Sequence, residues 1–420
     1  MRAASSQTLW VLATSVLLAN GRTTSTAPLA VIPLDKQYVP IRRNNQIVSY
    51  KTAYSGRIYV GSGQPQNFSV VFDTGSGHIF LPSTSCQSKP CQSHARYDPG
   101  KSSSVKFIDH LGRKVDESED EVAISFGTGS IRGQFVEELV CLIDPQTGTM
   151  ATPNHEECVR VRLITANQMT EEPFESFSFD GVMGLGLAAL AVDPAFNVFE
   201  QFARRPRTEF TSQFAYFLSD DDSKPSEISF GGHDARRMQS ALRWAPVHKP
   251  HLGFWQVRVQ RVSVGGQDLS LCADGDCVAI ADTGTSLLGA PRQFTQQLHR
   301  LLARRVPGKQ DVDMDCREFP GPDVVFELEG GVEVRLGGKE YSRAAPMKVG
   351  ATPADIQILC RASLLPVDPT PALGSKTFIL GEPALRKYYT VYDWEQKSVG
   401  FALAQQAASS RPHAPNTVHV

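Results

Sequence analysis

Two segments of this 420-residue chain carry the same short pattern, and this repeat constrains the fold more than any other feature. The segments are 70–76 (VVFDTGS) and 278–286 (VAIADTGTS). In each one, an apolar run of strand length stops at an aspartate and a glycine soon follows, which predicts a buried strand that ends in a tight loop. An apolar pair and a glycine recur later in each half, at 182–184 (VMG) and 379–381 (ILG). The repeat predicts two related lobes facing each other across a pseudo-twofold axis.

Such a pair of lobes would bring Asp73 and Asp282 together. A single Asp-Thr-Gly is a weak signal, because its ordinary explanation is an aspartate turn, but two matched copies are more specific. Two carboxylates in contact share one proton, since both cannot ionise cheaply. The ionised carboxylate can then take a proton from a water molecule while the protonated one donates a hydrogen bond to the carbonyl under attack. The pair therefore predicts metal-free acyl hydrolysis.

Three positions in each loop are expected to support its aspartate. The glycines allow the backbone to approach the carboxylates. The hydroxyl residues after them are expected to hydrogen-bond the outer carboxylate oxygens, and the threonines before them to lock the two loops together. These positions are Thr74, Gly75 and Ser76 in the first loop and Thr283, Gly284 and Thr285 in the second.

The composition is that of an ordinary globular protein, with 41% hydrophobic and 20% charged residues. Lys and Arg number 42 against 44 Asp and Glu, a formal charge of -2, so no broad attraction to nucleic acid or to an anionic membrane follows. The histidines match no metalloprotease spacing, and the short glycine pairs lack the context of a nucleotide loop. We therefore expect no cofactor, no metal and no nucleic-acid partner.

The start of the chain indicates export. Residues 1–27 combine a basic residue at position 2 with an apolar stretch at 9–19 and small residues suitable for cleavage, the pattern of a signal peptide and its cleavage region. An uncleaved membrane anchor is the alternative, although about 20 apolar residues are needed to span a bilayer. Residues 405–420 are polar and predict a disordered tail. We expect a monomer without a stable membrane span, secreted or held in an acidic vacuole, lysosome-like or secretory organelle.

The eight cysteines fit an oxidising compartment. Pairing of sequence neighbours predicts four disulfide bonds. Zinc is the alternative for the first pair, because a histidine at 94 gives the segment the look of a zinc knuckle, but no second ligand pair is spaced to complete a tetrahedral site. The expected pairs are Cys86 with Cys91, Cys141 with Cys158, Cys272 with Cys277, and Cys316 with Cys360.

With these motifs in place, the chain resembles the pepsin-type aspartic endopeptidases, of the pepsin and cathepsin D kind, over about residues 47–404. The resemblance implies a mostly β, bilobal pepsin-like fold with a substrate cleft and a flap hairpin. It also implies an N-terminal lobe at 47–240 and a C-terminal lobe at 241–404. Besides the two Asp-Thr-Gly loops, the matching segments are YSGRIYVG at 54–61, ISFGTGSIRG at 124–133, FDGVMGLG at 179–186, FGGHD at 230–234, FWQ at 254–256 and the closing run from residue 379.

The resemblance also implies a set of residues in the flap and cleft, and two of them depart from the family pattern. The usual flap tyrosine falls at Phe126, and the tryptophan that usually hydrogen-bonds it falls at Phe80. Replacement of both polar partners by apolar rings can be nearly neutral, so we expect the two phenylalanines to pack together. The expected flap and cleft residues are Phe80, Phe126, Gly127, Thr128, Ile280 and Ser286.

The leader is a further departure. Only residues 28–46 separate the expected cleavage region from the body of the chain, which is shorter than the inhibitory prosegment of relatives. Lys36, Arg42 and Arg43 offer cations for contact with the aspartates, but such residues are more often solvated, and we expect that here. An Asn-Phe-Ser sequon at 67–69 is a candidate glycosylation site.

These features favour an aspartic endopeptidase that acts on peptides or proteins at acidic pH. A non-catalytic binding or inhibitor protein on the same fold is the alternative, because a fold alone does not prove activity. A glycosidase with paired carboxylates is a third hypothesis, but it calls for a wider separation and usually a glutamic acid.

Overall fold

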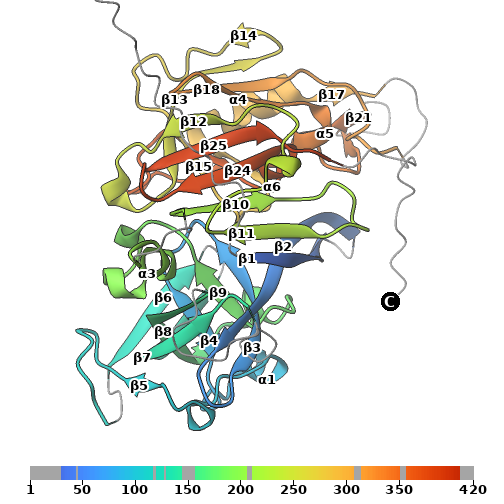
Figure 1. The fold of residues 1–420 in the computed structure, drawn as a ribbon. Helices are drawn as coiled ribbons and strands as arrows, with labels where there is room; N and C mark the ends of the chain where they lie inside the picture. Colours follow the sequence, from blue (N-terminus) through green and yellow to red (C-terminus); the bar gives the residue numbers. More distant parts are fainter. Residues whose placement is uncertain are drawn as a thin grey trace, which may run out of the picture.

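The computed structural model describes residues 30–43, 46–116, 120–126, 129–143, 157–205, 211–306, 314–350 and 356–406. The expected signal peptide and the last fourteen residues of the expected tail lie outside the described part of the chain, as do Gly127 and Thr128. Figure 1 shows two stacked parts, one coloured blue to green and the other yellow to red, with β1, β2, β10 and β11 between them. The fold is mostly β and bilobal, as the resemblance implies.

The larger sheet runs through both parts. Its strands therefore mix the beginning, middle and end of the sequence. The order is β12 (Arg243–Pro246), β25 (Ser398–Leu403), β24 (Tyr388–Asp393), β10 (Gln213–Phe217), β11 (Ser226–Phe230), β1 (Ala30–Arg43), β2 (Gln46–Val60), β3 (Gln66–Asp73), β9 (Gly181–Gly184), β4 (Ile79–Pro82), β8 (Cys158–Met169), β7 (Gly129–Cys141) and β5 (Lys106–Phe107), with β6 (Glu121–Phe126) paired to β7.

Two further sheets belong to the C-terminal part. The first has the order β19 (Val332–Leu336), β18 (Val324–Leu328), β13 (Gln256–Val264), β15 (Val278–Ala281), β23 (Thr377–Leu380), β16 (Leu288–Pro291) and β22 (Leu364–Val367), with β14 (Gln267–Asp268) paired to β13. The second is small and has the order β17 (Arg304–Arg305), β21 (Gln357–Cys360) and β20 (Met347–Val349).

Helices in the described chain are short and lie around the sheets. The α-helices are α1 (Lys89–Ser93), α2 (Glu171–Phe174), α3 (Val198–Ala203), α4 (Arg292–Leu302), α5 (Gly338–Tyr341) and α6 (Glu382–Lys387). Short 3-10 helices, each one turn long, are η1 (Pro99–Lys101), η2 (Ala188–Leu190), η3 (Pro194–Phe196), η4 (Ala235–Arg237) and η5 (Pro250–Leu252). None of the helices in this part of the chain is long and apolar enough to cross a membrane.

The two parts repeat one strand arrangement, which explains the repeated sequence pattern. In the N-terminal part β3 runs parallel to β9, and β9 runs antiparallel to β4, which is parallel to β8. In the C-terminal part β15, β23, β16 and β22 have the same relations in the same order. The Val, Ile, Phe and Ala residues of β3 and β15 are buried, as expected for strands in the middle of a sheet. The apolar pair and glycine of each half form the parallel partner, β9 or β23.

The expected leader region contributes a strand to this sheet. Ala30–Leu34 pairs with β11, and the rest of β1 pairs with β2 as a long hairpin. Ala30, Ile32 and Leu34 are buried in the main hydrophobic core. The segment therefore lies between the two parts rather than outside them. The expected lobe boundary near residue 240 falls in the loop before β12.

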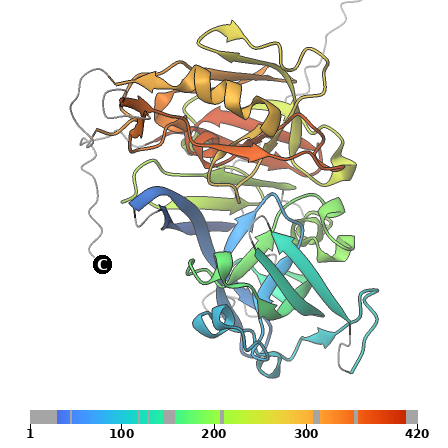
Figure 2. The ribbon, with the colours of Figure 1, turned by 180° about the vertical axis from the view of Figure 1, so that it is seen from behind.

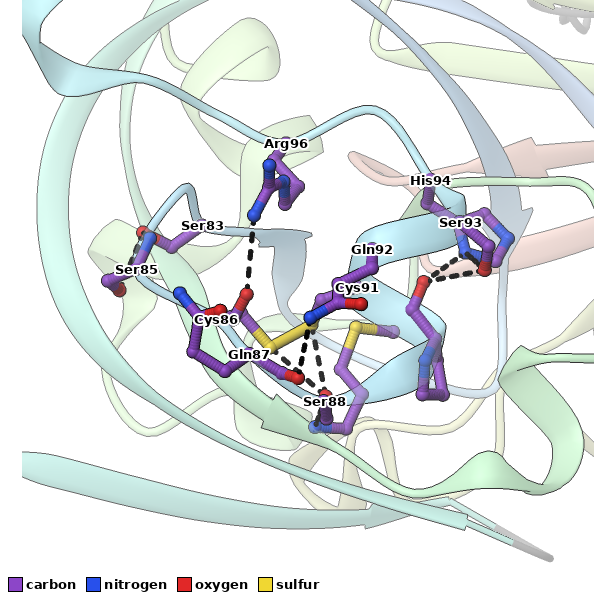
Figure 3. The surroundings of a disulfide bond; sticks show 12 residues. Ser83, Ser85, Cys86, Gln87, Ser88, Cys91, Gln92, Ser93, His94 and Arg96 are labelled. Atoms are coloured by element: carbon purple, nitrogen blue, oxygen red, sulfur yellow. Dashed lines mark hydrogen bonds between the residues drawn. A yellow bond between two sulfur atoms is a disulfide. The ribbon is translucent and has the colours of Figure 1, made fainter.

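The structure contains four disulfide bonds, at the four pairs that the sequence predicts. Each one joins two positions within the same part of the molecule. Around the first pair, shown in Figure 3, the Ser88 hydroxyl lies beside both sulfur atoms, and His94 points away from them. The His94 ring nitrogens lie 2.6 Å and 2.8 Å from the carbonyl oxygens of Pro90 and Phe177, so both nitrogens have backbone partners.

Candidate active site

The two aspartates lie where equivalent strands end, at the boundary between the two parts. Asp73 is the last residue of β3, and Asp282 follows β15 directly. The backbone of each is tied to the neighbouring strand of its own sheet. The Leu185 amide donates to the Asp73 carbonyl at 2.7 Å, and the Asp282 amide donates to the Leu380 carbonyl at 3.2 Å. Each aspartate is thus positioned by a strand pair in the middle of a sheet.

Two threonines join the loops across the boundary. The Thr74 amide donates to Oγ1 of Thr283 at 3.0 Å, and the Thr283 amide donates to Oγ1 of Thr74, also at 3.0 Å. Each hydroxyl then donates to a carbonyl of the opposite strand: Thr74 to Ala281 at 2.9 Å and Thr283 to Phe72 at 2.7 Å. Because four hydrogen bonds cross between the loops, their relative position is tightly fixed.

The glycine of each loop lies against the carboxylate of the other loop. A Cβ atom added to Gly75 would lie 3.0 Å from Oδ1 of Asp282, and one added to Gly284 would clash with the Asp73 carboxylate. These approaches leave no room for a side chain. The carboxylates of Asp73 and Asp282 are therefore neighbours, as the repeat predicts.

Each carboxylate also accepts hydrogen bonds from its own loop. The Gly75 amide donates to Oδ1 of Asp73, and the Gly284 amide donates to Oδ1 of Asp282, both at 2.9 Å. Thr285 Oγ1 donates to Oδ2 of Asp282 at 2.6 Å, as expected. The Ser76 hydroxyl is buried and lies close enough to Asp73 to lower the pKa of that carboxyl through a side-chain hydrogen bond. A lasting hydrogen bond from Ser76 to Asp73 stays a prediction.

The surroundings raise the pKa of both carboxyl groups. Burial is the main cause for each, because it disfavours the charged form. Asp282 is raised further by the negative charge of Asp73, while Thr285 and Gly284 act in the opposite direction. One carboxyl of the pair is therefore held protonated at a pH where an isolated aspartate is ionised. Both residues keep a partly accessible surface.

Three aromatic rings lie together at the β6–β7 hairpin. The ring centroids of Phe80 and Phe126 are 5.0 Å apart, so the two phenylalanines pack together as expected from their joint substitution. Phe174 of α2 completes the cluster, at 5.6 Å from Phe80 and 6.2 Å from Phe126. Phe80 and Phe174 are buried, whereas Phe126 is partly accessible near the end of β6.

The other expected cleft residues have different environments. The Ser286 hydroxyl donates to the Thr52 carbonyl at 2.7 Å and accepts from the Thr52 amide at 3.1 Å. A cavity of about 550 Å³ lies beside this pair, lined also by Tyr38 and Arg386. Ile280 is 3% exposed within β15, so a contact between it and a substrate stays a prediction.

The expectation of a solvated Lys36 is wrong. Its side chain is only 10% exposed, and Nζ lies 3.3 Å from Glu382 and 3.4 Å from Asp222. Tyr54 donates a hydrogen bond to Oε1 of Glu382 at 2.8 Å, and Thr52 donates to the same carboxylate. Lys36 therefore belongs to a buried ion-pair cluster between the N-terminal hairpin and α6. The side chains of Arg42 and Arg43 lie outside the described part of the structure.

Sequence reasoning missed two tyrosines behind the loops, as well as Phe174. The hydroxyl of Tyr216 donates to the carbonyl of Phe72, which also accepts from Thr283. Tyr392 is fully buried near Thr74, and burial is the main cause that raises its pKa. Tyr392 lies in the closing motif, but no spacing indicates that it reaches the first loop. Within the described ranges, no group of three or more His, Cys, Asp or Glu side chains is placed to hold a metal ion.

Comparison with known proteins gives a consistent result. Residues 53–404 match the family model of eukaryotic aspartyl proteases. Gastricsin of Homo sapiens is 30% identical over 358 residues, which cover 84% of this chain and 81% of gastricsin. Renin of Ovis aries is 32% identical over 363 residues, which cover 84% of this chain and 81% of that renin. Chymosin of Callithrix jacchus is 31% identical over 358 residues, which cover 84% of this chain and 81% of that chymosin.

Proposed function

Because this chain belongs to the eukaryotic aspartyl protease family and is an aspartic endopeptidase, we propose that Asp73 and Asp282 are its catalytic pair. The observation that carries the assignment is the reciprocal approach of each loop glycine to the opposite carboxylate. The threonine hydrogen bonds support it, because they hold the two loops in one fixed relation.

The proposed reaction uses one shared proton. The ionised carboxylate of the pair removes a proton from a water molecule, and the protonated carboxyl donates a hydrogen bond to the scissile carbonyl oxygen. The water oxygen then bonds to the carbonyl carbon, and the C–N bond breaks after the nitrogen has been protonated. The raised pKa of both carboxyls supports this division of roles, since one of them stays protonated when its neighbour is charged.

The substrate is a peptide or protein in extended conformation. Gly127 and Thr128, which lie between β6 and β7 in the sequence, are proposed to contact the substrate backbone. The Phe80, Phe126 and Phe174 cluster favours an apolar side chain next to the scissile bond, because desolvation of an apolar group against aromatic rings is favourable. The chain is proposed to act as a monomer and without a cofactor.

The protein enters the secretory pathway, in accord with its four disulfide bonds. We propose an acidic compartment or secretion as its destination, because a pair that shares one proton works best when the bulk pH is low enough to keep that proton bound. Peptide hydrolysis is expected to be slower at neutral pH.

Incubation of the purified chain with a diverse peptide mixture from pH 3 to 7 tests this function. We expect cleavage within peptides, at bonds flanked by apolar residues, and no cleavage by Asp282→Asn. A chelator should leave the rate unchanged, since the proposed chemistry uses no metal. Absence of any cleavage by a folded chain would favour the non-catalytic binding protein instead, and loss of cleavage on chelation would exclude the mechanism.

A further inference from the structure

A second cavity lies in the C-terminal part between α4 and the strands β20 to β22. Its volume is about 550 Å³, within the range of about 300–1,000 Å³ that is typical of small-molecule sites. Figure 2 shows α4 as the orange helix on the face of this part. The lining residues are Arg292, Thr295, Gln296, His299, Arg300, Ala303, Val349, Leu359, Arg361 and Pro366.

The charged residues of this lining all carry positive charge. Arg292 is paired with Asp368, which leaves Arg300 and Arg361. The amide of Arg343 donates to the Arg361 carbonyl at 3.0 Å, although Arg343 itself lines the first cavity rather than this one. In the described part of the chain, no carboxylate lies within ion-pair distance of Arg300, Arg343 or Arg361. Clustered cations without a counterion repel one another, so the arrangement is favourable when an anion joins it.

One nitrogen atom of this lining also lacks a partner. Nδ1 of His299 is shielded from solvent and has no hydrogen-bond partner in the described structure. Buried polar atoms without partners are rare, because each one has lost its hydrogen bonds to water.

The rest of the wall is apolar. Val349, Leu359 and Pro366 lie on the strand side, and Ala303 follows α4. A bare ion would leave these surfaces and most of the volume unfilled. The scaffold is rigid, since the strand pair β17–β21 ends beside the disulfide between Cys316 and Cys360, next to Arg361. The cavity thus combines cations for an oxyanion with an apolar wall for an attached organic group.

We propose that this cavity binds a phosphate or sulfate monoester, with its oxyanion at Arg300, Arg361 and His299 and its organic part against the apolar wall. Guanidinium groups suit such oxyanions because their planar forks donate two hydrogen bonds at once. The proposal is independent of the peptidase assignment, because none of the lining residues belongs to the aspartate loops.

Isothermal titration calorimetry on the whole chain tests the proposal, with phenyl phosphate, phenyl sulfate, inorganic phosphate and phenol as probes. Both phenyl esters should bind at least tenfold more tightly than inorganic phosphate, and phenol should not bind. Equal affinity for phenyl phosphate and inorganic phosphate would mean an adventitious ion only, and binding of phenol as tight as that of the esters would exclude an oxyanion site. Either result overturns the proposal.

Substitutions then locate the site. Arg361→Gln is expected to weaken phenyl ester binding about tenfold or more, because a charge-assisted hydrogen bond is removed. Arg361→Lys keeps the charge without the fork and should weaken it less. Arg305→Gln is the matched control, since Arg305 is an exposed arginine of β17 that does not line the cavity. The unfolding midpoint without ligand shows whether each variant folds. Unchanged affinity in folded Arg361→Gln would contradict the site.

The pH dependence gives an independent readout. Burial lowers the pKa of His299, and the positive charges of Arg361 and Arg343 lower it further. The other charged groups around this cavity are Arg292, Arg300 and Asp368. A bound anion would raise the pKa of His299 again. Binding would therefore be accompanied by protonation of His299, and the affinity should increase as pH falls. Phenyl sulfate is the probe, because a phosphate ester itself titrates near pH 6. We expect severalfold tighter binding at pH 5.5 than at pH 7.5, and none of this gain in His299→Gln. An equal gain in both proteins would remove His299 from the site.

Discussion

The amide of Thr74 lies 3.0 Å from Oγ1 of Thr283, and the amide of Thr283 lies 3.0 Å from Oγ1 of Thr74. These reciprocal bonds join residues from the two halves of the sequence at the base of the aspartate pair. Both residues lie immediately after their aspartates, so a shift of either threonine would move a carboxylate. The bonds therefore connect the stability of the two-part fold to the geometry of the proposed catalytic pair.

Thr74→Val should destabilise the protein by about 2–4 kcal/mol, because it leaves the Thr283 amide and the Ala281 carbonyl without their partners. Urea unfolding of the two proteins measures this difference. Thr74→Ser is the control, since it keeps the hydroxyl and should cost about 1 kcal/mol or less. If Val and Ser at this position were equally stable, the hydrogen bonds would not hold the loops together.

The aromatic pair at the hairpin predicts an energetic coupling. Phe126→Tyr places a hydroxyl near the apolar rings of Phe80 and Phe174, and we expect kcat/KM on one peptide to fall by the equivalent of about 1–3 kcal/mol. Adding Phe80→Trp supplies an N–H donor and should recover part of the loss, with a coupling of about 0.5–1.5 kcal/mol. Strict additivity in this cycle would show that the two positions do not interact during catalysis.

The sequence was sufficient for the fold class, the position of both aspartates and the disulfide pairs, because these rest on motifs that repeat or on neighbouring cysteines. Contacts between segments far apart in the sequence could not be predicted, because no motif marks them. Nothing near Lys36 indicates that Glu382 of α6 lies against it, and Phe174 reaches Phe80 only through the packing of α2 on the hairpin.

Lys36 should contribute to stability although it lies in the expected leader. Lys36→Met leaves Glu382 and Asp222 without this cation, and we expect a loss of about 2 kcal/mol in the free energy of unfolding. Lys51→Met is the matched control, because the Lys51–Glu172 pair is 3.8 Å long and more exposed, and its loss should cost less than about 0.5 kcal/mol. Similar losses in both variants would argue against a buried cluster at Lys36.

His78 predicts a loss of stability in acid. Burial lowers the pKa of His78 to about 4, and its Nε2 accepts a hydrogen bond from the Val192 amide, which requires the neutral ring. Since the unfolded chain binds the proton more readily, stability should fall as pH drops from about 6.5 to 4, by up to about 3 kcal/mol. His78→Gln keeps an acceptor without a titrating ring, so its unfolding midpoint should fall less over this range. An equal fall of stability with pH in the native chain and in His78→Gln would show that His78 is not responsible for the loss.

The most direct test of the catalytic pair is kcat/KM on one peptide as a function of pH, for the native chain, Asp73→Asn and Asp282→Asn. The native profile should be bell-shaped with an acidic optimum. Activity should fall at low pH as the second carboxyl is protonated, and at high pH as the shared proton is lost, a step delayed by the raised pKa of Asp282. Either Asn variant should lose at least about 100-fold at every pH. Undiminished turnover in a folded Asp73→Asn or Asp282→Asn protein would contradict the account.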